Sequence, residues 1–418
     1  MTKTFLVSIL TIVSVLFCIR YLTENVSGYT GYNTETTKCK HADNLLITES
    51  IRLVFAGDVM GHDMQLAGAW RDGGDSCYNF IPNFQWVKDY ISSADLAIAN
   101  LEVTFAGEPY SGYPAFSSPV ALAVALQDAG FDVLVTANNH ILDRGVSGLE
   151  STLNILDRLG FSHTGSFEDA YQRNTSYPLM IERNGFRLAF LNYTYGTNMS
   201  TAKPPTIVNY LDTTKIAEDL IRAQSLEADF IIACVHWGDE YQHKENATQQ
   251  QIADFLARHG CNLIVGSHPH VVQPIKKITG YVSTPDADYF VPPIKKAADY
   301  STDSVHIVNS LGNFISTDSI LVAYSLGNFI SNQRWRYSDG GIMLEVTLTK
   351  TDGRVTLDSY RYEPFWVHRY PEKGVQVYRL IPVLDYLTNP ERYPIISIDD
   401  EKLLIQFYKD TKEIAGGK

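Results

Sequence analysis

The chain has 418 residues, 45% of them hydrophobic and 19% charged, which is the composition of a folded protein with one large domain plus an appendage or with two domains. Its formal net charge of -13 argues against a general nucleic-acid-binding protein, because a phosphate backbone selects for lysine and arginine. We therefore expect no nucleic-acid partner.

The N-terminus has the pattern of an export segment. Lys3 precedes an apolar run over residues 5–19 that is apolar on every helical face and short for a membrane span. A polar stretch follows from Arg20 onward. The pattern predicts a signal peptide or membrane anchor over 1–28 and a linker over 29–50. We expect the remaining domain to lie on the extracytoplasmic side of the cell membrane.

From Ile51 onward, apolar runs alternate with amphipathic segments. The strands expected from these runs span 51–57, 95–100, 132–137, 186–193, 229–235 and 261–266. The expected helices span 119–130, 146–160, 213–228 and 248–260. Because strands covered by helices on both faces are apolar throughout, the alternation predicts a layered α/β fold, which we assign to a main domain over 51–370.

The second half of the chain interrupts this pattern. Residues 281–303 contain three prolines and predict a long surface loop. Beyond Gly341 the sequence predicts a β-hairpin with its turn at Asp352-Gly353. The tail over 371–418 predicts a small C-terminal cap with one helix at 399–414.

A 15-residue segment occurs twice in tandem. "SVHIVNSLGNFISTD" (304–318) is followed directly by "SILVAYSLGNFISNQ" (319–333). Two copies do not support a solenoid, so we interpret them as a local duplication. Both copies cannot fill one position in a sheet, and we expect one of them to form a loop or an added edge.

Polar residues follow the predicted strands at five places. In open α/β sheets, ligands bind at the carboxyl ends of strands, so one shared site explains all five. Taken singly, each residue has an alternative as a turn, cap or structural residue, and this alternative fits the His268 and His270 pair least well, because spacing i and i+2 points both side chains the same way. Imidazole, carboxylate and amide oxygen together form a mixed shell suited to zinc, manganese or iron. The candidates are Asp58, Asn100, Glu102, Asn139, His140, Asp143, His236, Glu240, His268 and His270.

The sequence resembles a known family in six motifs. "AGDVM", "ANLE", "ANNHILDRG", "HWGDEY", "GSHPHVVQP" and "YSLGNFISNQ" are similar, in order and spacing, to motifs of the bacterial CapA (PgsA-type) capsule and poly-γ-glutamate biosynthesis proteins. The resemblance covers about residues 51–345. That family is similar to the calcineurin-like metallophosphoesterases. The resemblance implies a four-layer α/β/β/α sandwich and an exported, membrane-associated protein that acts on an anionic polymer such as poly-γ-glutamate.

The resemblance also implies roles for individual residues. Asp58 and His270 would bind a first metal, Glu102 would bridge, and Asn139, His236 and His268 would bind a second. His140 would donate a proton or stabilise charge, and Asp143 would orient His140 or a nearby backbone group. Asn100, Glu240 and Asn328 would line the substrate site, or Asn328 would hold the loop of the histidine pair. The second copy of the duplication fits the family motif better, because it has Tyr324 and Gln333.

One residue departs from the phosphoesterase pattern. Met60 stands two residues after Asp58, where those enzymes have a histidine, and a thioether is a poor ligand for a hard divalent cation. His62 is an alternative ligand if the loop after Asp58 curls back. We therefore expect an altered site with one firmly bound metal and a second that is weak, water-rich or absent.

Three functions remain open at this stage. The first is a capsule-biosynthesis protein that, if an enzyme, is a metal-dependent hydrolase acting on a phosphoester, amide or cell-wall linkage. The second is a non-catalytic export or assembly factor that holds an anionic polymer through the metal and nearby lysines and works with a membrane synthase complex. The lysines in question are Lys276, Lys277, Lys295 and Lys296. The third is a periplasmic phosphatase without a polymer role.

Overall fold

The computed structural model describes residues 48–278 and 319–416. The predicted export segment, the 281–303 loop and the first copy of the duplication lie outside the described residues. Within the described ranges, no helix combines the length and the apolar character needed to cross a membrane.

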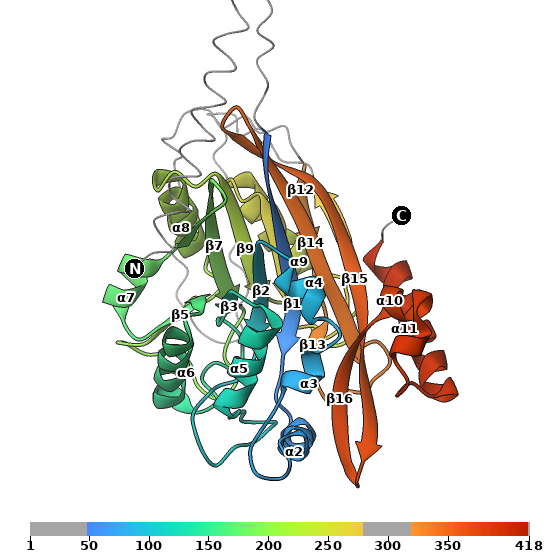
Figure 1. Ribbon diagram of the computed structural model, residues 1–418. Coiled ribbons are helices and arrows are strands. Elements are labelled where there is room, and N and C mark those ends of the chain that lie inside the picture. Colours follow the sequence, from blue (N-terminus) through green and yellow to red (C-terminus); the bar gives the residue numbers. More distant parts are fainter. Residues whose placement is uncertain (1–47, 279–318, 417–418) are drawn as a thin grey trace, which may run out of the picture. The chain divides into compact units, whose positions relative to one another are not determined.

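Two mixed β-sheets form the centre of the domain (Figure 1). The larger one has the order β16 (Val375–Pro382), β15 (Arg354–Glu372), β14 (Gly340–Thr351), β1 (Thr48–Val59), β2 (Leu96–Leu101), β3 (Val133–Val135) and β4 (Ser162–Thr164), and β13 (Asn328–Ile330) pairs with β1. The second has the order β11 (Ile275–Ile278), β12 (Ile320–Ala323), β10 (Leu263–Ser267), β9 (Phe230–His236), β7 (Phe186–Thr194) and β6 (Leu179–Arg183). A small ribbon joins β5 (Ser166–Phe167) and β8 (Ile207–Val208).

Helices cover the outer faces of both sheets and one edge of the larger sheet. Those on the larger sheet's side are α2 (Asp63–Asp72), α3 (Ile81–Phe84), α4 (Lys88–Ser92), α5 (Val120–Ala129) and α6 (Gly145–Leu159). Those near the second sheet are α7 (Ala170–Ser176), α8 (Thr213–Ser225) and α9 (Ala247–Arg258). The C-terminal elements α10 (Val383–Thr388), η1 (Pro390–Arg392) and α11 (Ile398–Ala415) lie beside β15 and β16 (Figure 1).

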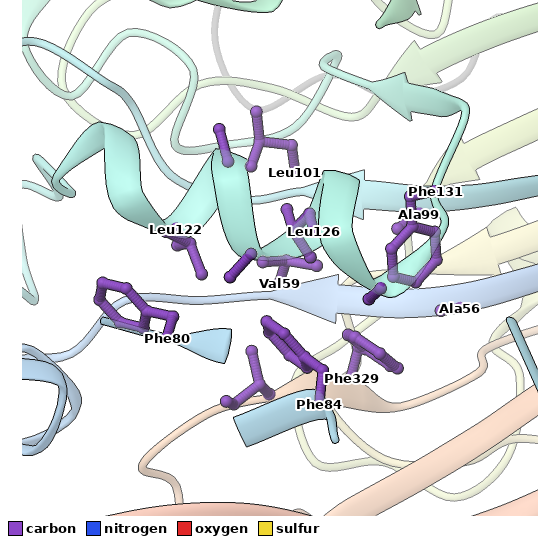
Figure 2. Close-up of a cluster of buried hydrophobic side chains, with 14 of the residues drawn as sticks. Ala56, Val59, Phe80, Phe84, Ala99, Leu101, Leu122, Leu126, Phe131 and Phe329 are labelled. Atoms are coloured by element: carbon purple, nitrogen blue, oxygen red, sulfur yellow. The ribbon is translucent and has the colours of Figure 1, made fainter. Parts of the chain in front are cut away.

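The buried part of strand β1 is largely apolar because both of its faces are covered. Successive side chains of a strand point to opposite faces. Leu53 and Phe55 belong to the buried cluster between the two sheets, whereas Val54 and Ala56 pack on the outer face beneath the helices. Figure 2 shows this outer cluster, in which Leu122 and Leu126 of α5 lie over Val59. The predicted four-layer α/β/β/α arrangement is therefore confirmed.

All six predicted strands and all four predicted helices are present, with boundaries shifted by a few residues. The predicted turn is also confirmed: Asp352 and Gly353 both have positive φ, 52° and 78°, as a two-residue hairpin turn requires. Within 371–418, which the sequence assigns to a small cap, β16 pairs with β15 as an edge strand of the larger sheet. The predicted tail helix corresponds to α11.

The second copy of the duplication occupies a central position. Its β12 pairs in parallel with β10, and its β13 pairs in parallel with β1 through Asp58 and Asn328. Gly57 permits this contact, because a Cβ atom there would lie 1.9 Å from the backbone oxygen of Gly327. The assignment of the second copy to the family's structural position therefore agrees with the sheet topology.

Candidate metal centre

The candidate ligands gather where four strands end. Asp58 lies at the end of β1, Glu102 follows β2, and His236 ends β9. His268 and His270 follow β10, and these five side chains are all buried. The convergence follows from topology, because β1, β2, β9 and β10 run parallel within their sheets and their carboxyl ends lie at one edge of each sheet.

Glu102 links two groups of possible ligands. The ligand atoms of Glu102, His236 and His268 lie within 4.8 Å of one another, and so do those of Asp58, Glu102 and His270. The Oε1 atom of Glu102 is 3.7 Å from His236 Nε2 and 3.8 Å from His270 Nε2. A carboxylate oxygen between two imidazole nitrogens has the placement of a bridge between two ions. A third group combines His268 and His270 with Glu240, whose side chain is exposed.

The chemistry of this cluster fits a divalent cation. Burial, with the adjacent Asp58, raises the pKa of Glu102 well above its usual range. Burial, with the adjacent His268, lowers the pKa of His236, and burial lowers that of His268 to about 3. Glu102 Oε1, Asn139 Nδ2 and His268 Nδ1 are buried without a hydrogen-bond partner in the described part of the chain. Desolvated carboxylates beside neutral imidazoles are stabilised when a metal binds both.

Asn100 lies between the two carboxylates. Its Nδ2 donates to Asp58 Oδ1 at 2.8 Å and is 3.3 Å from Glu102 Oε2. Its Oδ1 accepts from Asn138 Nδ2, which also donates to the backbone oxygen of Leu101. The family resemblance implies a substrate-binding role for Asn100. In the structure its side chain contacts the carboxylates of Asp58 and Glu102 and would orient them.

Asn139 and His236 face each other. Asn139 Oδ1 is 2.9 Å from His236 Nε2, and His236 Nδ1 is 3.0 Å from Ser267 Oγ. When Nδ1–H donates to the serine, Nε2 and Asn139 Oδ1 present lone pairs to each other. In that tautomer both atoms would be available to one ion, whereas in the other tautomer Nε2–H donates to Asn139 Oδ1.

The histidine pair lies in a loop with unusual backbone geometry. His268 and His270 have φ values of 98° and 58°, which are costly for residues with a Cβ atom. Asp58 Oδ2 accepts from the backbone N–H of His268 at 3.2 Å, and the same oxygen lies 3.1 Å from His270 Nδ1. Asn328 is 3.1 Å from His270 Nδ1 through its Oδ1 and donates to the His270 backbone oxygen at 3.2 Å. Asn328 therefore holds the loop that carries the pair.

His140 and Asp143 form a buried hydrogen-bonded pair. Asp143 Oδ2 lies 2.7 Å from His140 Nδ1 and also accepts from the backbone N–H of Phe116 at 2.8 Å. The Phe116 ring packs edge-on against the imidazole with centroids 4.7 Å apart. These contacts fix the orientation of the imidazole and favour the tautomer with the proton on Nδ1, which leaves Nε2 free for a reacting group.

Met60 and His62 lie apart from the ligand groups. Met60 is 2% exposed and belongs to the hydrophobic cluster on the outer face of the larger sheet. His62 Nδ1 is 3.0 Å from Gln65 Oε1 and accepts from the backbone N–H of Asn332. His62 begins α2 and packs edge-on against Phe116, so it belongs to none of the candidate ligand groups.

Two tyrosines beside the histidines were not identified from the sequence. The ring of Tyr195 lies 4.5 Å from that of His268, and the ring of Tyr241 lies 6.1 Å from that of His270, between centroids. Both side chains are partly exposed, at 45% and 36%, so they flank the mouth of the centre. Tyr195 directly follows β7, and this position at a strand end is the signal that would have identified it.

The two described lysines that were considered for polymer binding have partners outside this centre. Lys276 forms an ion pair with Glu245, and the Lys277 ammonium lies 6.0 Å from the ring of Tyr360. Lys295 and Lys296 lie outside the described residues.

The chain is similar to two curated capsule proteins. It is 29% identical over 260 residues to the PGA biosynthesis protein CapA of Bacillus subtilis, covering 59% of this chain and 64% of that protein. It is 26% identical over 249 residues to the capsule biosynthesis protein CapA of Bacillus anthracis, covering 56% and 57%. The matched regions thus span less than two thirds of the length of these relatives.

Solved structures with similarity to the chain include phosphatases. A calcineurin-like phosphoesterase, YfkN from Bacillus subtilis, has a TM-score of 0.41 and 12% identity, covering 87% of this chain and all (100%) of that one. A phosphatase from Mycoplasma pneumoniae has a TM-score of 0.37 and 15% identity, covering 82% and 99%.

A family model identifies the chain more directly. The model of the bacterial capsule synthesis protein PGA_cap matches residues 52–333, which include every candidate ligand described above. The match begins at Arg52, in the first predicted strand, and ends at Gln333, the last residue of the second copy of the duplication. The chain belongs to the bacterial capsule synthesis protein family PGA_cap.

Proposed function

We propose that this protein acts in the synthesis of an anionic capsule polymer, of which poly-γ-glutamate is the type substrate, as an exported, membrane-associated and metal-dependent hydrolase. The observation that carries the proposal is the buried Glu102 carboxylate, whose unpartnered Oε1 lies between His236 and His270. A structural carboxylate buried in this way would normally have hydrogen-bond donors of its own.

A bound divalent ion would polarise a carbonyl or phosphoryl oxygen of the substrate. The protein's own residues would divide the remaining work. Asn100 and Asn328 orient Asp58, Glu102 and the histidine loop. His140, held by Asp143 through Nδ1–H, would take up a proton at Nε2 and pass it to the leaving group. Tyr195 and Tyr241 flank the mouth, where the substrate chain would enter.

A second function is supported by Met60. The thioether of Met60 stands where phosphoesterases have a histidine ligand, so one of the two metal positions should bind its ion more weakly. A protein that only holds a polymer for export can work with a single ion that binds the polymer and does not catalyse its cleavage. In that role the ion would bridge the acidic polymer to a protein of net charge -13, in contact with a membrane synthase.

Complementation and polymer digestion test the proposal. In a capsule-negative strain that lacks its own family member, the wild-type chain should restore capsule and His268→Ala should not. His163→Ala is the matched control, because His163 pairs with Asp157 outside the centre. Equal capsule in both variants would contradict the metal-dependent role. Purified protein with Mn²⁺ or Zn²⁺ should shorten poly-γ-glutamate, whereas binding without shortening would favour the assembly role.

A further inference from the structure

A pocket separate from the metal centre lies between β15, α11 and the segment that follows β13. Its volume is about 410 Å³, which is the size of small-molecule sites. Three arginines line it, Arg334, Arg336 and Arg369, together with apolar side chains such as Trp366 and Phe407.

Two of the three arginines have no acid partner among the described residues. Arg336 binds Asp410 through two hydrogen bonds, of 3.1 and 2.9 Å, and its charge is thereby compensated. Arg369 donates only to the amide oxygen of Asn332, at 3.1 Å. Arg334 donates through Nη1 to the backbone oxygen of Val367 at 2.8 Å. Two adjacent guanidinium groups therefore retain their full positive charge.

The unused edge of Arg334 is the one that recognises oxyanions. Its Nε and Nη2 atoms are buried and have no acceptor in the described part of the chain. These two N–H groups form a planar fork that matches a carboxylate or phosphate. Burial, with the nearby Arg369, lowers the pKa of Arg334 to about 10, although Tyr378 and Asp339 act in the opposite direction. An anion from outside would supply the acceptor and the charge together.

The acids in the pocket do not compete for this edge. Asp339 accepts from Trp366 Nε1 at 2.8 Å. Asp400 accepts from the backbone N–H of Ser397 and lies 3.3 Å from His368. Asp410 is paired with Arg336 as described above. The positive side of the pocket therefore remains available to a ligand.

The pocket lies at the same edge of the larger sheet as the metal centre. Trp366 pairs with Gly340, which follows the segment 331–338, and β15 is two strands from β1, about 10 Å across the sheet. The segment 331–338 contacts both sites: Gln333 accepts from Asn328, and Arg334 lines the pocket. A polymer long enough to pass the metal centre can thus reach the arginines.

We propose that Arg334 and Arg369 form a subsite for the carboxylate or phosphate groups of an anionic polymer, separate from the metal centre. The nature of the polymer rests on the proposed function, whereas the oxyanion site rests on the arginines alone. Repeated acidic groups would let one chain occupy the subsite and the metal centre together, which increases affinity without new contacts.

Binding to the full-length protein with chelator present tests the subsite. The probes are inorganic phosphate, a short γ-linked glutamate oligomer and a short glycerol-phosphate oligomer, measured by calorimetry. The double variant Arg334→Gln with Arg369→Gln should bind the favoured oligomer about tenfold more weakly or worse, because charge-assisted hydrogen bonds are lost. Arg361→Gln is the control: it removes one positive charge from β15 at an exposed arginine, which pairs with Glu345 outside the pocket.

The outcomes separate the subsite from the proposed function. Unchanged binding in the double variant overturns the subsite. A second outcome is that an oligomer binds only with metal present, binds the double variant and does not bind His268→Ala. This outcome overturns the subsite and supports the proposed function. If no probe binds to the wild type, the subsite is also overturned. The proposed function is then tested separately by measuring the metal content of the protein. Tighter binding of the phosphate oligomer supports the subsite and assigns a phosphate polymer as its ligand.

Two further single variants test the subsite with changes that are less disruptive to folding than the double variant. Arg334→Lys keeps the charge but lacks the planar fork, so it should weaken binding less than Arg334→Gln and more than the Arg361→Gln control. Arg369→Gln alone removes a single hydrogen bond, to Asn332, and should fold as the wild type does. If both bind as tightly as the control, the subsite is refuted.

Discussion

The carboxylate of Glu102 is fully buried, and its neighbours include a second carboxylate, Asp58, and the imidazoles of His236 and His270. In the absence of a cation, ionising Glu102 costs free energy, because the charge would be removed from water beside a second acid, and the pKa of Glu102 is raised accordingly. With a cation, the same arrangement becomes favourable. The stability of the protein should therefore respond to metal through this residue.

Replacing Glu102 with glutamine keeps the shape of the side chain and removes its charge. Addition of Mn²⁺ at a hundredfold excess over its dissociation constant should raise the wild-type free energy of unfolding by about 2.7 kcal/mol. We expect Glu102→Gln to gain less than half of this, measured by urea denaturation with and without metal. The control is Glu218→Gln, an exposed residue of α8. A variant that gains as much as the wild type would contradict the bridging role.

Asp143 offers a second test at this scale. Its Oδ2 accepts from both His140 and the Phe116 backbone in a buried setting, so Asp143→Asn leaves one partner less well bound. We expect the free energy of unfolding to fall by about 1–3 kcal/mol. Asp157 pairs with His163 at the surface and is 62% exposed, so Asp157→Asn should cost under about 0.5 kcal/mol. Equal losses in the two variants would refute the structural part of this role.

Among the elements, the strands that are buried on both faces were predictable, whereas the edge strands were not. The runs that became β1, β2 and β9 are nearly continuous in apolar residues because both faces are covered. In contrast, β16 is an edge strand within the part that the sequence assigns to a small cap. Its sequence mixes apolar residues with polar ones, and only its pairing with β15 defines it as a strand.

The duplicated segment leads to a prediction about β12 and β13. Deletion of 304–318 should leave the fold intact, because the second copy already pairs with β10 and β1. Deletion of 319–333, a segment of the same length, would bring the first copy into register. His306 would then replace the buried Leu321, and Asn309 would replace Tyr324, which stacks on Trp237.

Burying a histidine in place of a core leucine, with loss of the aromatic contact, should cost about 2–5 kcal/mol. Thermal melts of the two deletion variants measure this difference directly. If both variants melt at the same temperature, the second copy is not the one that the fold requires.

Strand β15 also carries a pH-dependent contact with α10. Burial raises the pKa of Glu363 from 4.5 to about 7, although it accepts a hydrogen bond from the backbone N–H of Leu384 at 3.1 Å. Because the folded pKa exceeds the unfolded one, the folded protein binds more protons between these values. The contribution to stability is complete below pH 4.5 and is lost as the pH rises toward 7.

Glu363→Gln keeps an acceptor for Leu384 and does not ionise. Relative to this variant, the wild type should lose up to about 3 kcal/mol of unfolding free energy between about pH 5 and pH 8. Urea denaturation at the two pH values gives the difference, in which other titrating groups cancel. Glu391→Gln at the surface of η1 should follow the wild type. A wild type and a Glu363→Gln variant with the same pH dependence would disprove the assignment.

At the scale of the whole molecule, the sequence predicted which residues form the candidate metal centre, but not the contacts that position their side chains. The ends of β1, β2, β9 and β10 carry the polar residues that the sequence pattern and the family resemblance had singled out. Tyr195 was missed although it follows a predicted strand, whereas Ser267 and the arginines of the pocket were missed because their contacts join segments distant in sequence. The segment 331–338 is such a case, since it lies between the metal centre and the arginine pocket.

We expect this chain to assemble a divalent metal centre around Glu102 and His268. Elemental analysis of the full-length protein, loaded with metal and then dialysed, tests it most directly. We predict at least one divalent ion retained per wild-type chain, the same amount in His163→Ala, and almost none in His268→Ala. A wild type that retains no divalent ion, or a His268→Ala variant that retains as much as the wild type, would contradict the account.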